Sequence, residues 1–147
     1  MPELIGIDHI YLTVADLQRS EPFYDVVMPL LGFRKNEFEI AGDRHVQYFN
    51  RHFGYVLRPA RSARAHDPYS PGLHHLCFRV ESAAHVEEAA RTLRAGDIAV
   101  TDAALYPEYA PDYVACFFDD PDGIRLEITN YRLERRERHD HWQVPNS

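Results

Sequence analysis

The sequence predicts an α+β protein of two βαβββ modules, which form a curved, half-open mixed sheet with helices on its outer face. The first observation is a repeat: residues 7–14 read Ile-Asp-His-Ile-Tyr-Leu-Thr-Val, and residues 73–80 read Leu-His-His-Leu-Cys-Phe-Arg-Val. Both stretches alternate apolar and polar side chains, as strands with one buried face do. A helix pattern and three short strand patterns follow each stretch, and this order gives a sheet covered on one side.

In the first module, a helix is expected directly after the first strand. Asp16 can cap this helix, and its apolar positions 23, 26, 27, 30 and 31 fall on one face. Gly32 can end it, whereas Pro22 and Pro29 predict that it is irregular or broken. Strands are expected near 34–40, 45–50 and 53–58.

The second module repeats this order. Ser82 can cap a helix that ends at Gly96, with an apolar face formed by Val86, Ala89, Ala90 and Leu93. Strands are expected near 98–102, 113–119 and 124–130. The predicted organisation is therefore one domain, residues 1–132, with modules at about 5–58 and 73–131 and a linker at 59–72. Residues 133–147 are predicted to be a charged, solvated C-terminal tail, in which His139 and His141 could bind metal only adventitiously.

Composition narrows the class of protein. A chain of 147 residues suits one domain, and a formal net charge of −7 argues against a nucleic-acid partner, which requires a basic face. No apolar run approaches the roughly 20 residues that span a membrane, and the N-terminus lacks a signal-peptide pattern. The two cysteines, Cys77 and Cys116, are expected to be small buried strand residues in a reducing compartment. We therefore expect a cytoplasmic protein.

Side chains alternate between the two faces of a strand, and this alternation (strand parity) places three candidate metal ligands on the polar faces of their strands. His9 and His75 are equivalent in the repeat and lie opposite the apolar side chains of their strands. After the turn signal Pro121-Asp122-Gly123, Glu127 alternates with apolar neighbours and falls on the same face. Two imidazoles and a carboxylate suit one divalent Fe, Mn, Ni or Zn ion. Each of the three taken alone is more often a structural or solvated residue, but their agreement in position favours a metal site. Parity points His74 away from it.

Tyrosines and arginines complete the predicted site. Tyr113 or Tyr109 could donate a hydrogen bond to substrate or act as an acid or base, the alternative being aromatic packing at the sheet rim. Arg79, Arg125 and Arg58 are candidates for binding an anionic substrate, the alternative being solvated strand residues paired with nearby acids.

Over residues 5–131 the chain resembles the vicinal oxygen chelate superfamily of glyoxalases, extradiol dioxygenases, epimerases and bleomycin- or fosfomycin-resistance proteins. The motifs are Asp8-His9-Ile10, Phe23-Tyr24 with Leu31-Gly32-Phe33, His74-His75-Leu76-Cys77-Phe78, and Asp120-Pro121-Asp122-Gly123 with Leu126-Glu127. The resemblance implies that His9, His75 and Glu127 are the metal ligands. It also implies a homodimer, which would cover exposed sheet edges.

One departure from the family pattern bears on activity. Glyoxalase-like members usually add a fourth ligand on the last strand of the first module, which here reads Phe53-Gly54-Tyr55-Val56-Leu57-Arg58 and offers no such residue. Three ligands are the pattern of the extradiol dioxygenases and some relatives. The resemblance thus implies a metal-dependent lyase/isomerase or ring-cleaving dioxygenase, whose small substrate chelates the metal through two adjacent oxygens. The alternative is a non-catalytic binding or antibiotic-sequestering protein of the same fold.

Overall fold

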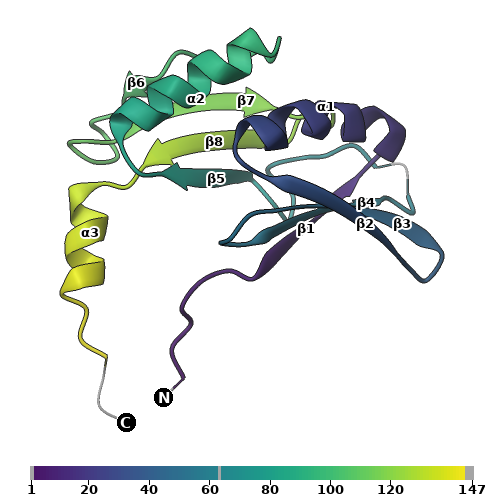
Figure 1. Cartoon of the computed structure of the whole chain (residues 1–147), viewed down its shortest axis with the longest axis horizontal. Helices are drawn as coiled ribbons and strands as arrows, with labels where there is room; N and C mark the ends of the chain where they lie inside the picture. The colour runs from purple at the N-terminus through teal and green to yellow at the C-terminus, as the bar shows by residue number, and fades with distance from the viewer. Residues whose placement is uncertain (1, 63, 145–147) are drawn as a thin grey trace.

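A computed structural model describes residues 2–62 and 64–144 and confirms the predicted fold class, with two four-stranded mixed sheets (Figure 1). The first sheet contains β1 (His9–Val14), β2 (Arg34–Ile40), β3 (Asp43–Phe49) and β4 (Gly54–Pro59), in the order β1-β4-β3-β2. The second contains β5 (His75–Val80), β6 (Ala104–Leu105), β7 (Val114–Asp119) and β8 (Arg125–Asn130), in the order β5-β8-β7-β6. The strands of the two sheets follow the same order, which shows that the module is repeated. In this order β1 and β5 are edge strands.

The expected strand at 98–102 is wrong. The outer neighbour of β7 in the sheet is instead β6, which has only two residues. Thr101 explains the difference: its backbone N–H donates to the Phe117 carbonyl, but its hydroxyl accepts the Phe117 N–H that a strand carbonyl would otherwise take. The side chain thus replaces the backbone ladder at this point.

Helix α1 (Leu17–Leu30) is continuous, so the predicted break at its prolines does not occur. Asp16 caps it by accepting from the Gln18 N–H at 3.0 Å, and the buried side chains of Tyr24, Val27 and Met28 hold the helix between the two prolines. Burial of these side chains offsets the hydrogen bonds lost at Pro22 and Pro29.

Of the apolar positions predicted to face the core, Val26 and Leu30 are instead exposed. They lie against the end of the other helix, α2 (Ala83–Ala95). A Cβ atom at Gly96 would be only 3.0 Å from Leu30 and 3.3 Å from Val26, so glycine permits this close approach of the helices. Within α2 the prediction is confirmed: Ser82 caps the helix, and the four predicted apolar side chains are buried.

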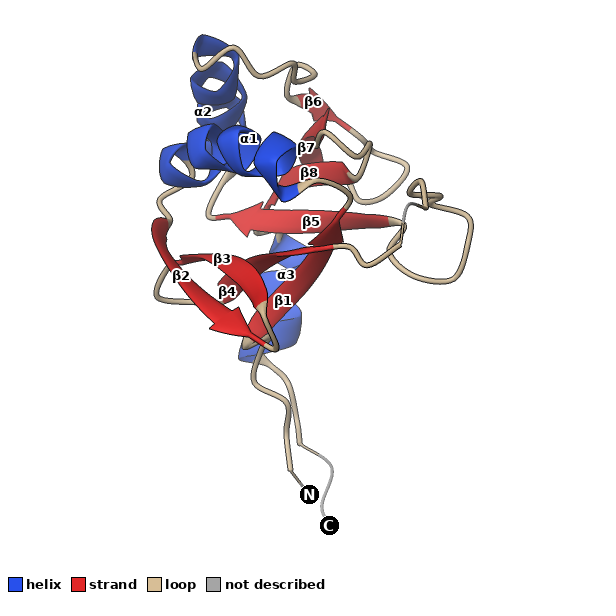
Figure 2. Cartoon of the chain, turned by 90° about the vertical axis from the view of Figure 1, so that its right-hand side faces the viewer, coloured by secondary structure: helices blue, strands red, loops and turns tan. Residues whose placement is uncertain are grey.

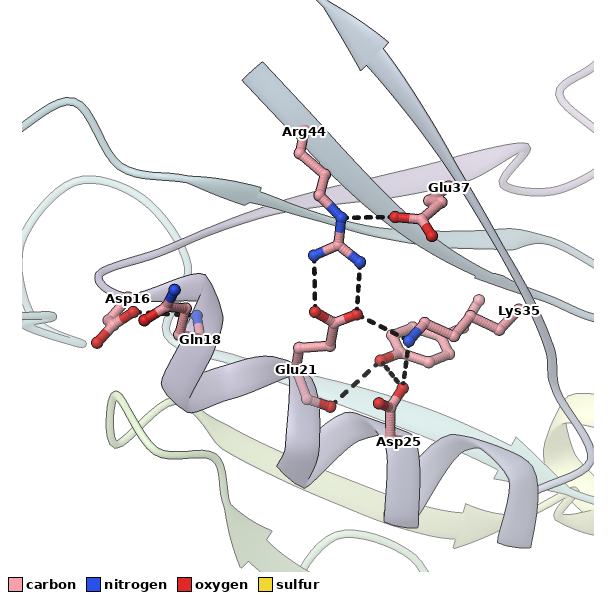
Figure 3. A network of polar contacts seen from close by, with 8 residues as sticks. Asp16, Gln18, Glu21, Asp25, Lys35, Glu37 and Arg44 are labelled. Carbon is pink, nitrogen blue, oxygen red and sulfur yellow. Dashed lines mark hydrogen bonds and ion pairs between the residues drawn. The ribbon is translucent and has the colours of Figure 1, made fainter.

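Charged side chains tie α1 to the β2–β3 hairpin (Figure 3). Glu21 accepts two hydrogen bonds from Arg44, at 2.7 and 2.8 Å, and one from Lys35 at 2.8 Å. These contacts, the Arg44 hydrogen bond first among them, lower the pKa of the Glu21 carboxyl to about 2. Tyr48 adds a hydrogen bond to Asp25 on the next turn of the helix.

The two modules pack together through their apolar, helix-bearing faces. The buried Tyr24 hydroxyl donates to Asp120 at 2.8 Å, and the Phe78 ring lies 5.9 and 6.2 Å from the rings of Tyr55 and Phe53. The polar face of each sheet, with His9 on one and Glu127 on the other, is therefore on the outside of this contact. The two modules of one chain therefore do not form the single concave, polar face that a curved, half-open sheet of both modules would have.

Two segments extend away from this body on the same side (Figures 1 and 2). Residues 2–8 form an arm without helix or strand. The expected tail is described to residue 144 and begins with a helix, α3 (Leu133–Asp140), which contains no buried residue. The rest of that tail lies outside the described residues. In the described ranges, no helix is long and apolar enough to cross a membrane.

Candidate metal and substrate site

Two of the predicted ligands meet on the second sheet. His75 and Glu127 are on the adjacent parallel strands β5 and β8, and His75 Nε2 lies 3.5 Å from Glu127 Oε1. Glu127 is only 4% exposed, whereas the imidazole is open to solvent. A buried carboxylate beside an accessible imidazole has the donor chemistry of a site for a divalent metal.

Tyr113 fixes the other oxygen of this carboxylate. Its hydroxyl donates to Glu127 Oε2 at 2.5 Å, so the two oxygens of Glu127 have different neighbours. Burial, and then the hydrogen bond to Glu127, raise the pKa of the Tyr113 phenol, which keeps it protonated as a donor. Tyr109 is exposed, and its ring packs 5.2 Å from the Tyr113 ring.

Arg132 supports Tyr113 and is a residue that the sequence analysis missed. Its guanidinium lies 4.4 Å from the centroid of the Tyr113 ring, and its side chain is almost fully buried. A buried cation over an aromatic face is a favourable contact. The one available signal, an arginine directly after the last strand, is too common to identify it.

Two further neighbours of the pair differ from expectation. Cys77 is on the exposed polar face rather than buried, although Cys116 is buried as predicted. The pKa of the Cys77 thiol is raised to about 12, first by the protein atoms packed around the sulfur and then by the negative charge of Glu127. Cys77 is therefore a neutral thiol. His74 does not point away: its Nδ1 lies 2.8 Å from that of His75. Strand parity fails there because β5 begins at His75.

His9 is on the first sheet, at the start of β1. Its Nδ1 lies 2.7 Å from the Asp8 carboxylate, which orients the ring. It lines a cavity of about 380 Å³ whose polar walls include Asn36, Gln47, Asn50 and His52. In residues 2–62 and 64–144, no group of three or more His, Cys, Asp or Glu side chains is arranged to hold a metal ion. One chain thus brings together two of the three predicted ligands.

The three arginines lie at different places. Arg125 is the register partner of His75 on β8, and its Nε is 3.4 Å from Asp119. Arg79 lies at the other end of β5, with its guanidinium 4.0 Å over the Tyr131 ring. Arg58 is in the first sheet, where it donates to Asp43 at 2.7 Å.

Comparison with known proteins identifies the family. The model of the glyoxalase/bleomycin resistance protein/dioxygenase superfamily matches residues 6–128. The chain belongs to this superfamily. A search of curated proteins finds no match to it.

Solved structures of the superfamily share the fold. A glyoxylase/bleomycin resistance protein/dioxygenase domain from Frankia sp. EAN1pec is 25% identical, with a TM-score of 0.71, over 88% of this chain and 100% of that one. A glyoxalase family protein from Enterococcus faecalis is also 25% identical, with a TM-score of 0.67, over 85% and 97%. The fosfomycin resistance protein FosX from Listeria monocytogenes is 18% identical, with a TM-score of 0.62, over 91% and 99%, a likeness of fold.

Proposed function

We propose that this superfamily member is a metal-dependent enzyme whose small substrate chelates the metal through two adjacent oxygens. The observation that carries the proposal is the His75–Glu127 pair, in which Tyr113 holds the buried carboxylate on one oxygen and leaves the other toward the imidazole. Such hydrogen bonds to a ligand are what metal sites use to orient their first ligands. The reaction class is a lyase/isomerase or a ring-cleaving dioxygenase.

The third ligand in this proposal is His9 of a second copy. The modules of one chain are packed back to back, so its own His9 faces outward on the other sheet. A twofold dimer that sets the His9 face of each copy against the His75–Glu127 face of the other creates two equivalent sites. Each site then contains two imidazoles and a carboxylate, which suit Fe, Mn, Ni or Zn. FosX, which shares the fold, has been crystallised with Mn(II).

Each group has a role in this arrangement. The metal would supply Lewis acidity to two neighbouring oxygens of the substrate. Tyr113 keeps Glu127 oriented, and Arg125, the register partner of His75, would hold an anionic group of the substrate. A FosX variant has been crystallised with Mn(II) and 1S,2S-dihydroxypropylphosphonic acid, an anion with two adjacent hydroxyls, and this supports a ligand of that class.

The test is the metal content of the purified protein. Protein prepared without chelator should contain about one divalent metal per chain, and His75→Ala should lose most of it, because the remaining ligands bind far more weakly. The matched control is His85→Ala, which removes an exposed imidazole on the outer helix α2 and should retain the metal. Equal metal content in the wild type and in His75→Ala would overturn the proposal and favour a ligand-sequestering protein.

A further inference from the structure

We infer that the N-terminal arm of one copy docks on α3 and Trp142 of the second copy. The inference rests on the proposed site shared between two copies. The arm, residues 2–8, carries Leu4 and Ile5, which are 93% and 96% exposed, and Ile7 is exposed as well. Adjacent apolar side chains that are almost fully exposed to solvent are typical of an interaction surface.

The second surface is on the C-terminal segment. None of the residues of α3 is buried, and its apolar side chain Leu133 is exposed together with Trp142 and Val144 beyond the helix. Figure 1 shows α3 following directly on β8, the strand that carries Glu127, and the arm leading directly into β1, the strand that carries His9. Each apolar surface is therefore continuous with one half of the proposed site.

The topology brings the two surfaces together. His9 and His75 are the first residues of the edge strands β1 and β5. If these strands meet antiparallel across the dimer, which is the commoner pairing, the residues before His9 run beside the partner's β5 toward its C-terminal end. There β5 lies beside the end of β8, and α3 begins three residues later. Seven extended residues span about 23 Å, enough to pass the six residues of β5.

Charge complements this contact. The arm contains Glu3 and Asp8 and no basic residue. α3 contains three arginines and three acidic residues, but Arg135 has further cations beside it: partial burial, and then the charges of Arg138, Arg79 and Arg132, lower the pKa of Arg135 against the opposing charge of Glu134. An acidic segment placed there would relieve repulsion among these cations. Twofold symmetry then gives two identical contacts, with each copy providing one arm and one helix.

The protein's single tryptophan provides the test, because Trp142 is 59% exposed in one copy and would be covered in the docked dimer. Wild type, Leu4→Ser/Ile5→Ser and the control Leu105→Ser would be compared by light scattering over a dilution series and by acrylamide quenching of Trp142. Leu105 is an exposed apolar residue of β6 that pairs with Val114, on the face of the second sheet opposite Glu127. The arm lies outside the core, so the double variant should fold, which circular dichroism checks.

We expect the double variant to raise the dimer Kd about tenfold to hundredfold, since two buried apolar side chains are lost. Trp142 should then be quenched more readily at concentrations where wild type is dimeric, and Leu105→Ser should match wild type. A wild-type dimer with the same Trp142 quenching in the double variant would overturn the arm contact and leave the shared site standing. A wild type that is monomeric at every concentration would overturn both.

Discussion

Tyr113 gives the Glu127 carboxylate a fixed orientation through one hydroxyl, and that hydroxyl can be removed on its own. Tyr113→Phe keeps the ring under Arg132 but deletes the 2.5 Å hydrogen bond to Oε2. The metal Kd should rise about tenfold to hundredfold, as it does when such orienting groups are lost elsewhere. Titration of chelator-stripped protein with Mn(II) or Zn(II) measures the change.

Tyr109→Phe is the matched control, because the Tyr109 ring packs against the Tyr113 ring without contacting the carboxylate. It should leave the metal Kd within about twofold of wild type. Equal affinities in all three proteins would show that Tyr113 only fills space beside Glu127.

At the scale of single residues, parity predicted well wherever the backbone is a regular strand. It placed His75 and Glu127 on one face of the sheet, as the β5–β8 register shows. It failed at His74, which lies one residue before its strand begins. The contact of Arg132 with Tyr113 joins two segments whose approach depends on the course of the loop before β7, and local periodicity contains no information about that course.

Among the elements, the Glu21 network between α1 and the β2–β3 hairpin predicts a pH-dependent contribution to stability. Glu21→Gln should lower the free energy of unfolding by about 1–2 kcal/mol at neutral pH, since Arg44 and Lys35 are partly screened by solvent. The pKa of Glu21 is lowered from 4.5 to about 2, so this stabilisation is fully present above pH 4.5 and is lost as the pH falls toward 2. Urea unfolding at several pH values measures it.

Glu37→Gln is the control for this prediction, because Glu37 contacts the same arginine but is exposed. It should cost less than about 0.5 kcal/mol. A Glu21→Gln difference that stays constant from pH 7 to pH 3 would contradict the assigned pKa.

Element prediction from the sequence succeeded where local signals agreed. Ser82, the apolar face of α2 and Gly96 all indicated one helix, and that helix forms. In α1 the prolines predicted a break, but buried side chains from the middle of the helix outweigh the two lost hydrogen bonds. The region 98–102 read as a strand because Ile98 and Val100 alternate, yet the Thr101 hydroxyl takes the place of a backbone acceptor.

For the whole molecule, the decisive prediction is that the site is shared between copies. When His9→Ala and His75→Ala chains are co-expressed in equal amounts, about half of the dimers contain one of each, and one of the two sites in such a dimer is intact. About a quarter of the wild-type metal content should therefore return, although each variant alone binds little. Metal analysis of the purified mixture measures the recovery.

A site contained within one chain would show no such recovery. Mixing His75→Ala with Glu127→Gln serves as the control, because both changes fall on the same half of the site and their mixed dimers contain no intact site. Recovery in this control as well would point to an exchange artefact instead of complementation.

The way in which the two modules pack against each other could not be predicted from the sequence. Periodicity indicates which face of each sheet is apolar and which is polar, but two modules with the same pattern can place their polar faces together or apart. The contacts that decide it, such as Tyr24 with Asp120 and Phe78 with Tyr55, join residues far apart in the chain. The local sequence around one residue of such a pair gives no information about its partner.

The back-to-back packing of the modules has a thermodynamic consequence. A metal ion held between two copies strengthens their association by the same factor by which association strengthens metal binding. Chelation would then favour separate chains, and dilution would release metal. Well below the dimer Kd, the number of complete sites would rise with the second power of protein concentration, so doubling the amount of protein would raise the total activity about fourfold.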